Sequence, residues 1–420
     1  MSSDSPSTAP RRRLGVRAFN RVAGALRKIG IPPASLSEES LLDRARRKTG
    51  LSEFGDERFR EPLGVLLKAY EEESELTPLG RILTRASTVG LLSNRLQVED
   101  VLKRHPEVLE TSVRRPLFIT GFPRTGTTLL YNLLAQDPLN RPLMMWEAVS
   151  PVPSVCRSKR SSDPRIRRAI WIAAALRRLA PDLPAIHPIT PTGPEECSRL
   201  LLNTFVTVYA VMENWVPSYR SWLLSRPPEV FEHAYRDYYR QLQVLQWQRP
   251  PRGRWLLKSP AHLFSLGALL AVFPDACVVQ LHRDPCQVIP SLCSLFAVYQ
   301  AIGSNRVRNE QIGQEILTLS AEGLRRSRLA RDSARPGQIL DLNYRDLVGD
   351  PIGTLRKISD HFGDEFPDDV RRAAERWIDG NPKNKHGAHR YSLQRFGLDR
   401  GTIEQTFQTY CRQYDVPPEA

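Results

Sequence analysis

The sequence is poor in residues that form disulfides or bind metals. Its 420 residues include six cysteines and eight histidines, and none of them forms a CxxC pair or a zinc-ligand spacing. We therefore expect free thiols, a cytoplasmic location and no metal. No run approaches the roughly 18 uninterrupted apolar residues that a membrane-spanning helix needs. The first residues lack the apolar core of a signal peptide, so we expect none.

The charge lacks the pattern of a nucleic-acid-binding protein. The formal net charge is +14, and arginine supplies most of the positive charge. These residues are scattered, whereas proteins that bind single strands gather them in a groove with interleaved aromatic residues. We therefore predict that the anionic partner is a small polyanion or a lipid, and not a nucleic acid.

Hydrophobic periodicity divides the chain into parts. Residues 1–12 are rich in Ser, Pro and Thr, and we expect a disordered tail there. Residues 13–112 show helical periodicity, which predicts a helical N-terminal segment. In residues 113–420 short apolar runs alternate with helical patterns, which predicts a parallel sheet with right-handed crossovers. Residues 155–250, approximately, form a helical insertion that we interpret as an acceptor-binding cap.

The fold class that follows is α/β, with a P-loop-type parallel sheet flanked by helices and joined to the helical N-terminal segment and cap. Four apolar runs are strand candidates: Leu117–Thr120, Trp255–Leu257, Ala276–Leu281 and Gln338–Leu342. Cap aromatics such as Phe205, Tyr209 and Tyr219 suit either an apolar acceptor or a core.

Residues 14–29 predict a basic amphipathic helix. We favour packing of this helix on the domain. The alternative is that it lies on a membrane surface as a peripheral contact, which would suit a lipid acceptor.

The strongest motif is the glycine-spaced loop Gly121–Thr128, GFPRTGTT, between a predicted strand and a predicted helix. In such a loop successive backbone N–H groups converge on an anion, and the helix adds its positive end. Nucleotide-hydrolysing P-loops share the glycine spacing but require a lysine where this chain has Thr127. An ATP-dependent, kinase-like phosphotransferase is therefore the less favoured, alternative hypothesis.

A second motif lies downstream, where Arg283 ends a predicted strand and Ser291 follows in the next helix. A guanidinium group and a hydroxyl together suit a phosphate dianion. Taken alone, this pattern is more often a turn with a structural ion pair. Together with the loop, it predicts two anion sites in one nucleotide pocket.

Both motifs resemble those of sulfotransferases that use 3′-phosphoadenosine-5′-phosphosulfate (PAPS). The loop is similar to their 5′-phosphosulfate loop, and Arg283 with Ser291 is similar to their 3′-phosphate site. The likeness is closer to the tyrosylprotein and bacterial types than to the cytosolic aryl type. It implies transfer of a sulfuryl group from PAPS to a hydroxyl of a small molecule, lipid or glycolipid, leaving 3′,5′-ADP. The oligomeric state is left open.

The resemblance also implies the residues that contact the nucleotide. Tyr344 belongs to a segment like the family's Y-E-D-L, although Arg345 replaces the glutamate, and Lys385 lies in a basic loop near the C-terminus. The complete set of expected nucleotide contacts is Arg124, Thr125, Gly126, Thr127, Thr128, Arg283, Ser291, Tyr344 and Lys385.

The chemistry needs a cation and a general base, and the sequence offers one candidate for the cation and three alternatives for the base. Lys258 ends a predicted strand, where side chains reach the crevice of a parallel sheet, and we assign it the cation at the bridging oxygen. For the general base, Glu147 resembles the glutamate of tyrosylprotein-type enzymes and His262 resembles the histidine of cytosolic enzymes, with a shifted spacing in each case. The acidic pair Glu195–Glu196 is a third alternative, and the choice stays open.

Overall fold

The computed structural model describes residues 34–152, 163–181, 183, 189–381 and 392–419. The expected tail at residues 1–12, the basic helix at residues 14–29 and Lys385 lie outside the described residues.

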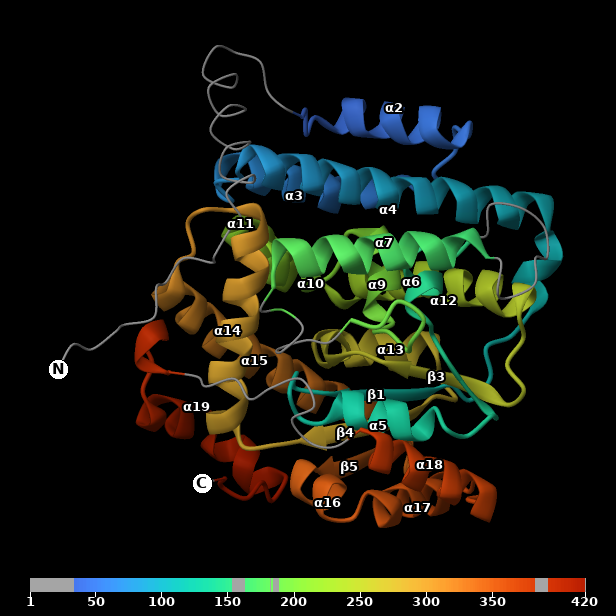
Figure 1. Cartoon of the computed structure of the whole chain (residues 1–420), viewed down its shortest axis with the longest axis vertical. Coiled ribbons are helices and arrows are strands. Elements are labelled where there is room, and N and C mark those ends of the chain that lie inside the picture. Colours follow the sequence, from blue (N-terminus) through green and yellow to red (C-terminus); the bar gives the residue numbers. More distant parts are fainter. Residues whose placement is uncertain (1–33, 153–162, 182, 184–188, 382–391, 420) are drawn as a thin grey trace.

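A parallel five-stranded sheet lies at the centre of the fold, with strand order β2-β3-β1-β4-β5 (Figure 1). Its strands are β1 Leu117–Gly121, β2 Asn140–Pro142, β3 Arg254–Lys258, β4 Cys277–His282 and β5 Ile339–Asn343. The α/β prediction and its four strands are confirmed. Strand β2 was not predicted, because three residues that end in proline carry no apolar run. The order in which the strands follow one another across the sheet changes direction at β1. In parallel sheets, ligands bind beyond the carboxyl ends of the strands at such a topological switch point.

Helices cover both faces of the sheet, which explains why β1 and β4 are buried along their whole length. Leu117 and Ile119 pack into a cluster that includes residues of α5, α16, α17 and α18, whereas Phe118 points to the larger core on the other face. The helices that follow the strands are α5 Thr127–Leu134, α13 Leu266–Val272, α14 Pro285–Gly303, α15 Asn309–Ala330, α16 Tyr344–Gly349, α17 Pro351–Phe362, α18 Asp368–Gly380 and α19 Arg400–Gln413, with 3₁₀ turns at Pro260–Ser265, Arg331–Ser333 and Gln394–Phe396.

The N-terminal helices and the cap form layers above the sheet (Figure 1). The first set comprises α2 Glu38–Thr49, α3 Arg60–Glu72 and α4 Pro78–Arg104, with 3₁₀ turns at Glu57–Phe59 and Pro106–Glu110. The cap comprises α6 Met145–Val149, α7 Pro164–Leu179, α9 Ser198–Leu201, α10 Tyr209–Glu213, α11 Pro217–Leu224 and α12 Pro228–Gln248, with a 3₁₀ turn at Leu202–Thr204.

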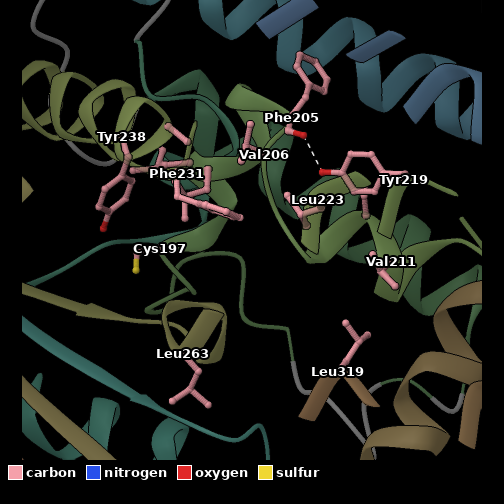
Figure 2. Close-up of a cluster of buried hydrophobic side chains, with 14 of the residues drawn as sticks. Cys197, Phe205, Val206, Val211, Tyr219, Leu223, Phe231, Tyr238, Leu263 and Leu319 are labelled. Atoms are coloured by element: carbon pink, nitrogen blue, oxygen red, sulfur yellow. Dashed lines mark hydrogen bonds between the residues drawn. The ribbon is translucent and has the colours of Figure 1, made fainter. Parts of the chain in front are cut away.

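The two sets of helices share one hydrophobic core. Figure 2 shows cap residues of this core, where the Tyr219 hydroxyl donates a 2.7 Å hydrogen bond to the Phe205 carbonyl. Leu41, Leu63 and Leu92 of α2, α3 and α4 belong to the same buried cluster. The N-terminal helices therefore pack against the cap and share its hydrophobic core.

Helix α14 carries much of this packing. In the described part of the chain it is the one helix that is long and apolar enough to cross a membrane. However, 78% of its apolar 18-residue stretch is buried inside the protein. Ser291, which the sequence assigned to the nucleotide site, lies in its first turns. Helix α14 thus joins the nucleotide edge of the sheet to the N-terminal helices, since it also packs against α4.

Candidate functional site

The loop after β1 needs its glycines. Gly121 has φ +135°, and a Cβ there would lie 2.4 Å from the Leu281 carbonyl oxygen of β4. Gly126 has φ +86°, and a Cβ there would lie 2.9 Å from the Tyr344 ring. Only glycine combines these torsions with such close approaches. The loop is therefore held tightly between β4 and α16.

This loop ends at the N-terminus of α5, which begins at Thr127. The first N–H groups of a helix have no carbonyl partner within the helix, and the helix dipole makes this end positive. Thr127 and Thr128 lie in that first turn and line a cavity of about 300 Å³. The Thr125 side chain is buried, and its hydroxyl donates to the Phe122 carbonyl at 2.7 Å, so it shapes the loop itself.

The second predicted motif meets the first one. Arg283, directly after β4, donates a 2.8 Å hydrogen bond to the Arg124 carbonyl. Arg124 in turn donates through Nε to the Ser291 hydroxyl at 3.1 Å. Two segments about 160 residues apart in the chain thus form a single polar edge of the cavity, and they do so through direct hydrogen bonds.

Tyr344 completes this edge from the start of α16. The Arg283 guanidinium carbon lies 3.9 Å from the centroid of the Tyr344 ring, a cation–π contact. Glu419 accepts hydrogen bonds from Arg283 at 2.9 and 2.8 Å. Desolvation alone would lower the pKa of Arg283, but the bond to Glu419 and the neighbouring Tyr344 and Asp284 raise it above its ordinary value. Arg283 is therefore a permanent cation at the cavity.

An ion pair also lies at this cavity. Lys258, at the end of β3, is buried, and its Nζ lies 2.7 Å from Glu196 Oε1 and 3.5 Å from Thr128 Oγ1. Glu196 lines the cavity. The Cys197 N–H donates to the Lys258 carbonyl at 3.0 Å, which holds the acidic segment against the end of the strand.

Glu147 occupies a different environment. It is 2% exposed, and its Oε1 lies 2.8 Å from Arg141 and 3.3 Å from Arg249. Its other oxygen accepts from the Met144 N–H at 3.1 Å. Among the described residues, those lining the 300 Å³ cavity do not include Glu147. The structure thus places this carboxylate in an interior ion pair at the start of α6.

His262 is also part of the interior. Its side chain is fully buried, with Nδ1 2.6 Å from the Tyr235 hydroxyl and Nε2 3.1 Å from the Cys197 sulfur. Burial lowers its pKa from 6.5 to about 3, so the ring is neutral at physiological pH. His262 is likewise absent from the described residues that line the cavity.

The structure therefore brings together Arg124, Gly126, Thr127, Thr128, Arg283 and Tyr344 at one cavity with Glu196, and places Ser291 and Lys258 in contact with them. Sequence reasoning missed Arg199, which also lines the cavity and lies 3.6 Å from Glu195. The i,i+4 spacing of Glu195 and Arg199 at the start of α9 was the available signal.

Comparison with known proteins agrees with this geometry. The chain matches the family model described as "Sulfotransferase family" over residues 116–368. The chain therefore belongs to the sulfotransferase family, as the motifs indicated.

Among solved structures it is similar to sulfotransferase STF1 from Mycobacterium tuberculosis H37Rv, with 34% identity, a TM-score of 0.78, and coverage of 89% of this chain and 98% of that one. It is also similar to sulfotransferase STF9 from Mycobacterium avium, with 27% identity, a TM-score of 0.83, and coverage of 92% and 98%. A curated relative, omega-hydroxy-beta-dihydromenaquinone-9 sulfotransferase Stf3 of Mycobacterium bovis, is 29% identical over 258 residues. That match covers 59% of this chain and 62% of the relative.

The position of Glu147 predicts a structural effect. Glu147→Gln removes the charge that compensates buried Arg141, and breaking such a pair typically costs about 3–5 kcal/mol. We expect the free energy of unfolding in urea to fall by about that amount. The exposed pair Glu404–Arg400 supplies the control, because Glu404→Gln should change stability by less than about 1 kcal/mol. A stable Glu147→Gln protein that has lost only its catalytic activity would contradict the structural role.

The burial of His262 predicts a pH dependence. The folded ring stays neutral down to about pH 3, whereas the unfolded ring binds a proton near pH 6.5, so stability is lost as pH falls between these values. Each extra proton contributes a slope of about 1.4 kcal/mol per pH unit. We expect wild type to lose about 1 kcal/mol more than His262→Gln between pH 6 and pH 5, measured by denaturant unfolding. Parallel pH curves for the two proteins would contradict this.

Proposed function

We propose that this protein transfers a sulfuryl group from PAPS to an acceptor hydroxyl and releases 3′,5′-ADP. One observation carries the proposal: two anion sites, at the Gly121 loop and at Arg283 with Ser291, are joined by hydrogen bonds at a cavity that also contains an acid and a lysine. PAPS has anionic groups at both ends of its nucleoside and supplies the sulfuryl group when it is bound.

The residues of the cavity fit such a molecule. The N–H groups at the start of α5, with Thr127 and Thr128, provide donors for the phosphosulfate oxygens. Arg283 and Ser291 provide a cation and a hydroxyl for the 3′-phosphate, and Arg124 contacts both of them. Gly121 and Gly126 allow the loop to pack tightly against Leu281 of β4 and the Tyr344 ring.

Glu196 is the general base in this proposal. Its carboxylate lines the cavity and can take the proton from an acceptor hydroxyl. Lys258 orients that carboxylate by the 2.7 Å contact, and its ammonium also lies next to Thr128 of the loop. A positive charge at this place stabilises negative charge that develops on oxygen during transfer. The proposal thus keeps Lys258 in its expected role and selects the third alternative for the base.

An ATP-dependent phosphotransferase is the other candidate, and the residues favour it less. Thr127 occupies the place of the P-loop lysine, and ATP has no 3′-phosphate for Arg283 and Ser291 to bind. For the acceptor we propose an apolar alcohol, because Leu292, Phe296 and similar side chains form much of the cavity wall. The named substrate of the Stf3 relative, a hydroxylated menaquinone, is of this chemical kind. A cytoplasmic location stays a prediction.

Nucleotide specificity tests the proposal. We expect 3′,5′-ADP to raise the melting temperature of the protein more than 5′-AMP or ATP with magnesium, because only 3′,5′-ADP places a phosphate on Arg283. Arg283→Ala should weaken 3′,5′-ADP binding at least tenfold, since a charge-assisted hydrogen bond contributes about 1.5–3 kcal/mol. Arg371→Ala, at a partly exposed position of α18 away from the cavity lining, is the control and should bind normally. Equal stabilisation by all three nucleotides would overturn the assignment.

The role of Glu196 has its own test. Glu196→Gln keeps the shape of the side chain but removes its basicity, and we expect kcat to fall by about 10²–10⁴. The affinity for 3′,5′-ADP should change little, because Glu196 lies at the acceptor edge. The matched comparison is Glu147→Gln, whose folded fraction should keep near-normal kcat. The opposite pattern would make Glu147 the base.

A further inference from the structure

We propose that a second cavity, between α4 and α7, binds the hydrocarbon chain of an alcohol whose hydroxyl reaches Glu196. The inference rests on the proposed function for the hydroxyl end of the acceptor. It adds the class of acceptor, a long-chain alcohol, and the place where the chain lies.

The second cavity is large and mostly apolar. Its volume is about 460 Å³, within the usual range for sites that hold small molecules. Residues of α3, α4, α7, α10 and α14 surround it, so it lies where the N-terminal helices meet the cap. Its apolar walls include Leu66, Leu83, Leu91, Ile172, Leu176 and Ile302. A cavity of this size and lining suits a flexible hydrocarbon chain.

This cavity adjoins the catalytic one. Arg199 and Tyr299 line both cavities, so these two side chains lie between the two spaces. Arg199 Nε lies 3.6 Å from Glu195 Oε2, and the Glu196 N–H donates to Glu195 Oε1 at 2.9 Å. Arg199, which borders both cavities, therefore contacts Glu195, the residue next to the proposed base Glu196. In this proposal, a molecule with its hydroxyl at Glu196 extends past Arg199 into the second cavity.

Three small residues that line the second cavity are also exposed at the surface. Ala86 and Ser87 of α4 and Ala175 of α7 line the cavity and are also exposed. Helices α4 and α7 run alongside each other in Figure 1, and both line this cavity. Short side chains at these exposed positions are where, in this proposal, a chain longer than the cavity extends outward.

The outer face of α7, on the same helix as Ala175, is unusually apolar for a surface. Trp171 is 77% exposed and Ile170 is 46% exposed. Large exposed apolar groups that adjoin a cavity are typical of sites that receive water-insoluble ligands. These residues therefore favour an apolar acceptor over a sugar or a peptide.

Binding of two primary alcohols of different length, measured by equilibrium dialysis on the full chain, tests the inference. If the chain enters the second cavity, each buried methylene should tighten binding about threefold to fourfold. We expect 1-dodecanol to bind at least 30-fold more tightly than 1-hexanol. Ala175→Trp and Ala86→Trp approach the cavity from opposite helices, and each should reduce this preference at least tenfold.

Thr406→Trp, at an exposed position of α19, is the control and should keep the preference. Unchanged 3′,5′-ADP binding in every variant would show that the proteins are folded. The inference is overturned if wild type does not prefer dodecanol, or if the preference survives both cavity substitutions. Failure of the proposed function looks different: dodecanol would bind as expected, but 3′,5′-ADP would not bind and no sulfuryl transfer would occur.

Discussion

The hydrogen bond from Arg283 to the Arg124 carbonyl is the contact that makes one site out of two motifs. It forms because the loop after β1 lies directly against β4, where the Gly121 Cα approaches the Leu281 carbonyl so closely that no side chain fits. Arg124 has φ +73°, an uncommon backbone conformation for a residue with a side chain, which the surrounding contacts must maintain. The geometry of the loop and the position of the downstream arginine thus depend on each other.

Three buried glutamates show how neighbours decide the role of a carboxylate. Glu147 lies between two arginines in the interior, Glu195 lies near Arg199, and Glu196 contacts Lys258 while it lines the cavity. All three side chains have the same chemistry in water. Glu195 and Glu196 both line the cavity and both have a cationic partner, but the partner of Glu196 is Lys258, which also lies next to Thr128 of the loop, and this position supports the proposed role of Glu196.

The N-terminal helices contribute to function through packing. They share the main core with the cap, and α4 contacts α14, the helix that also contains Ser291. The space that remains between α4 and α7 is the second cavity. An acceptor chain bound there would contact the N-terminal helices and the cap together, so the N-terminal segment would take part in acceptor selection.

The sequence alone determined the features that depend on neighbouring residues. The apolar runs predicted four parallel strands that the structure confirms, and the glycine spacing of residues 121–128 predicted the loop, because strand and turn preferences depend on residues close together in the chain. The two anion sites, at this loop and at Arg283 with Ser291, stay a prediction. Only the tertiary structure decided which acids line the cavity, why His262 is neutral, and that a second space lies where α4 and α7 meet. Those outcomes depend on burial by residues far away in the chain, and no local pattern around Glu147, His262 or Glu196 records that burial.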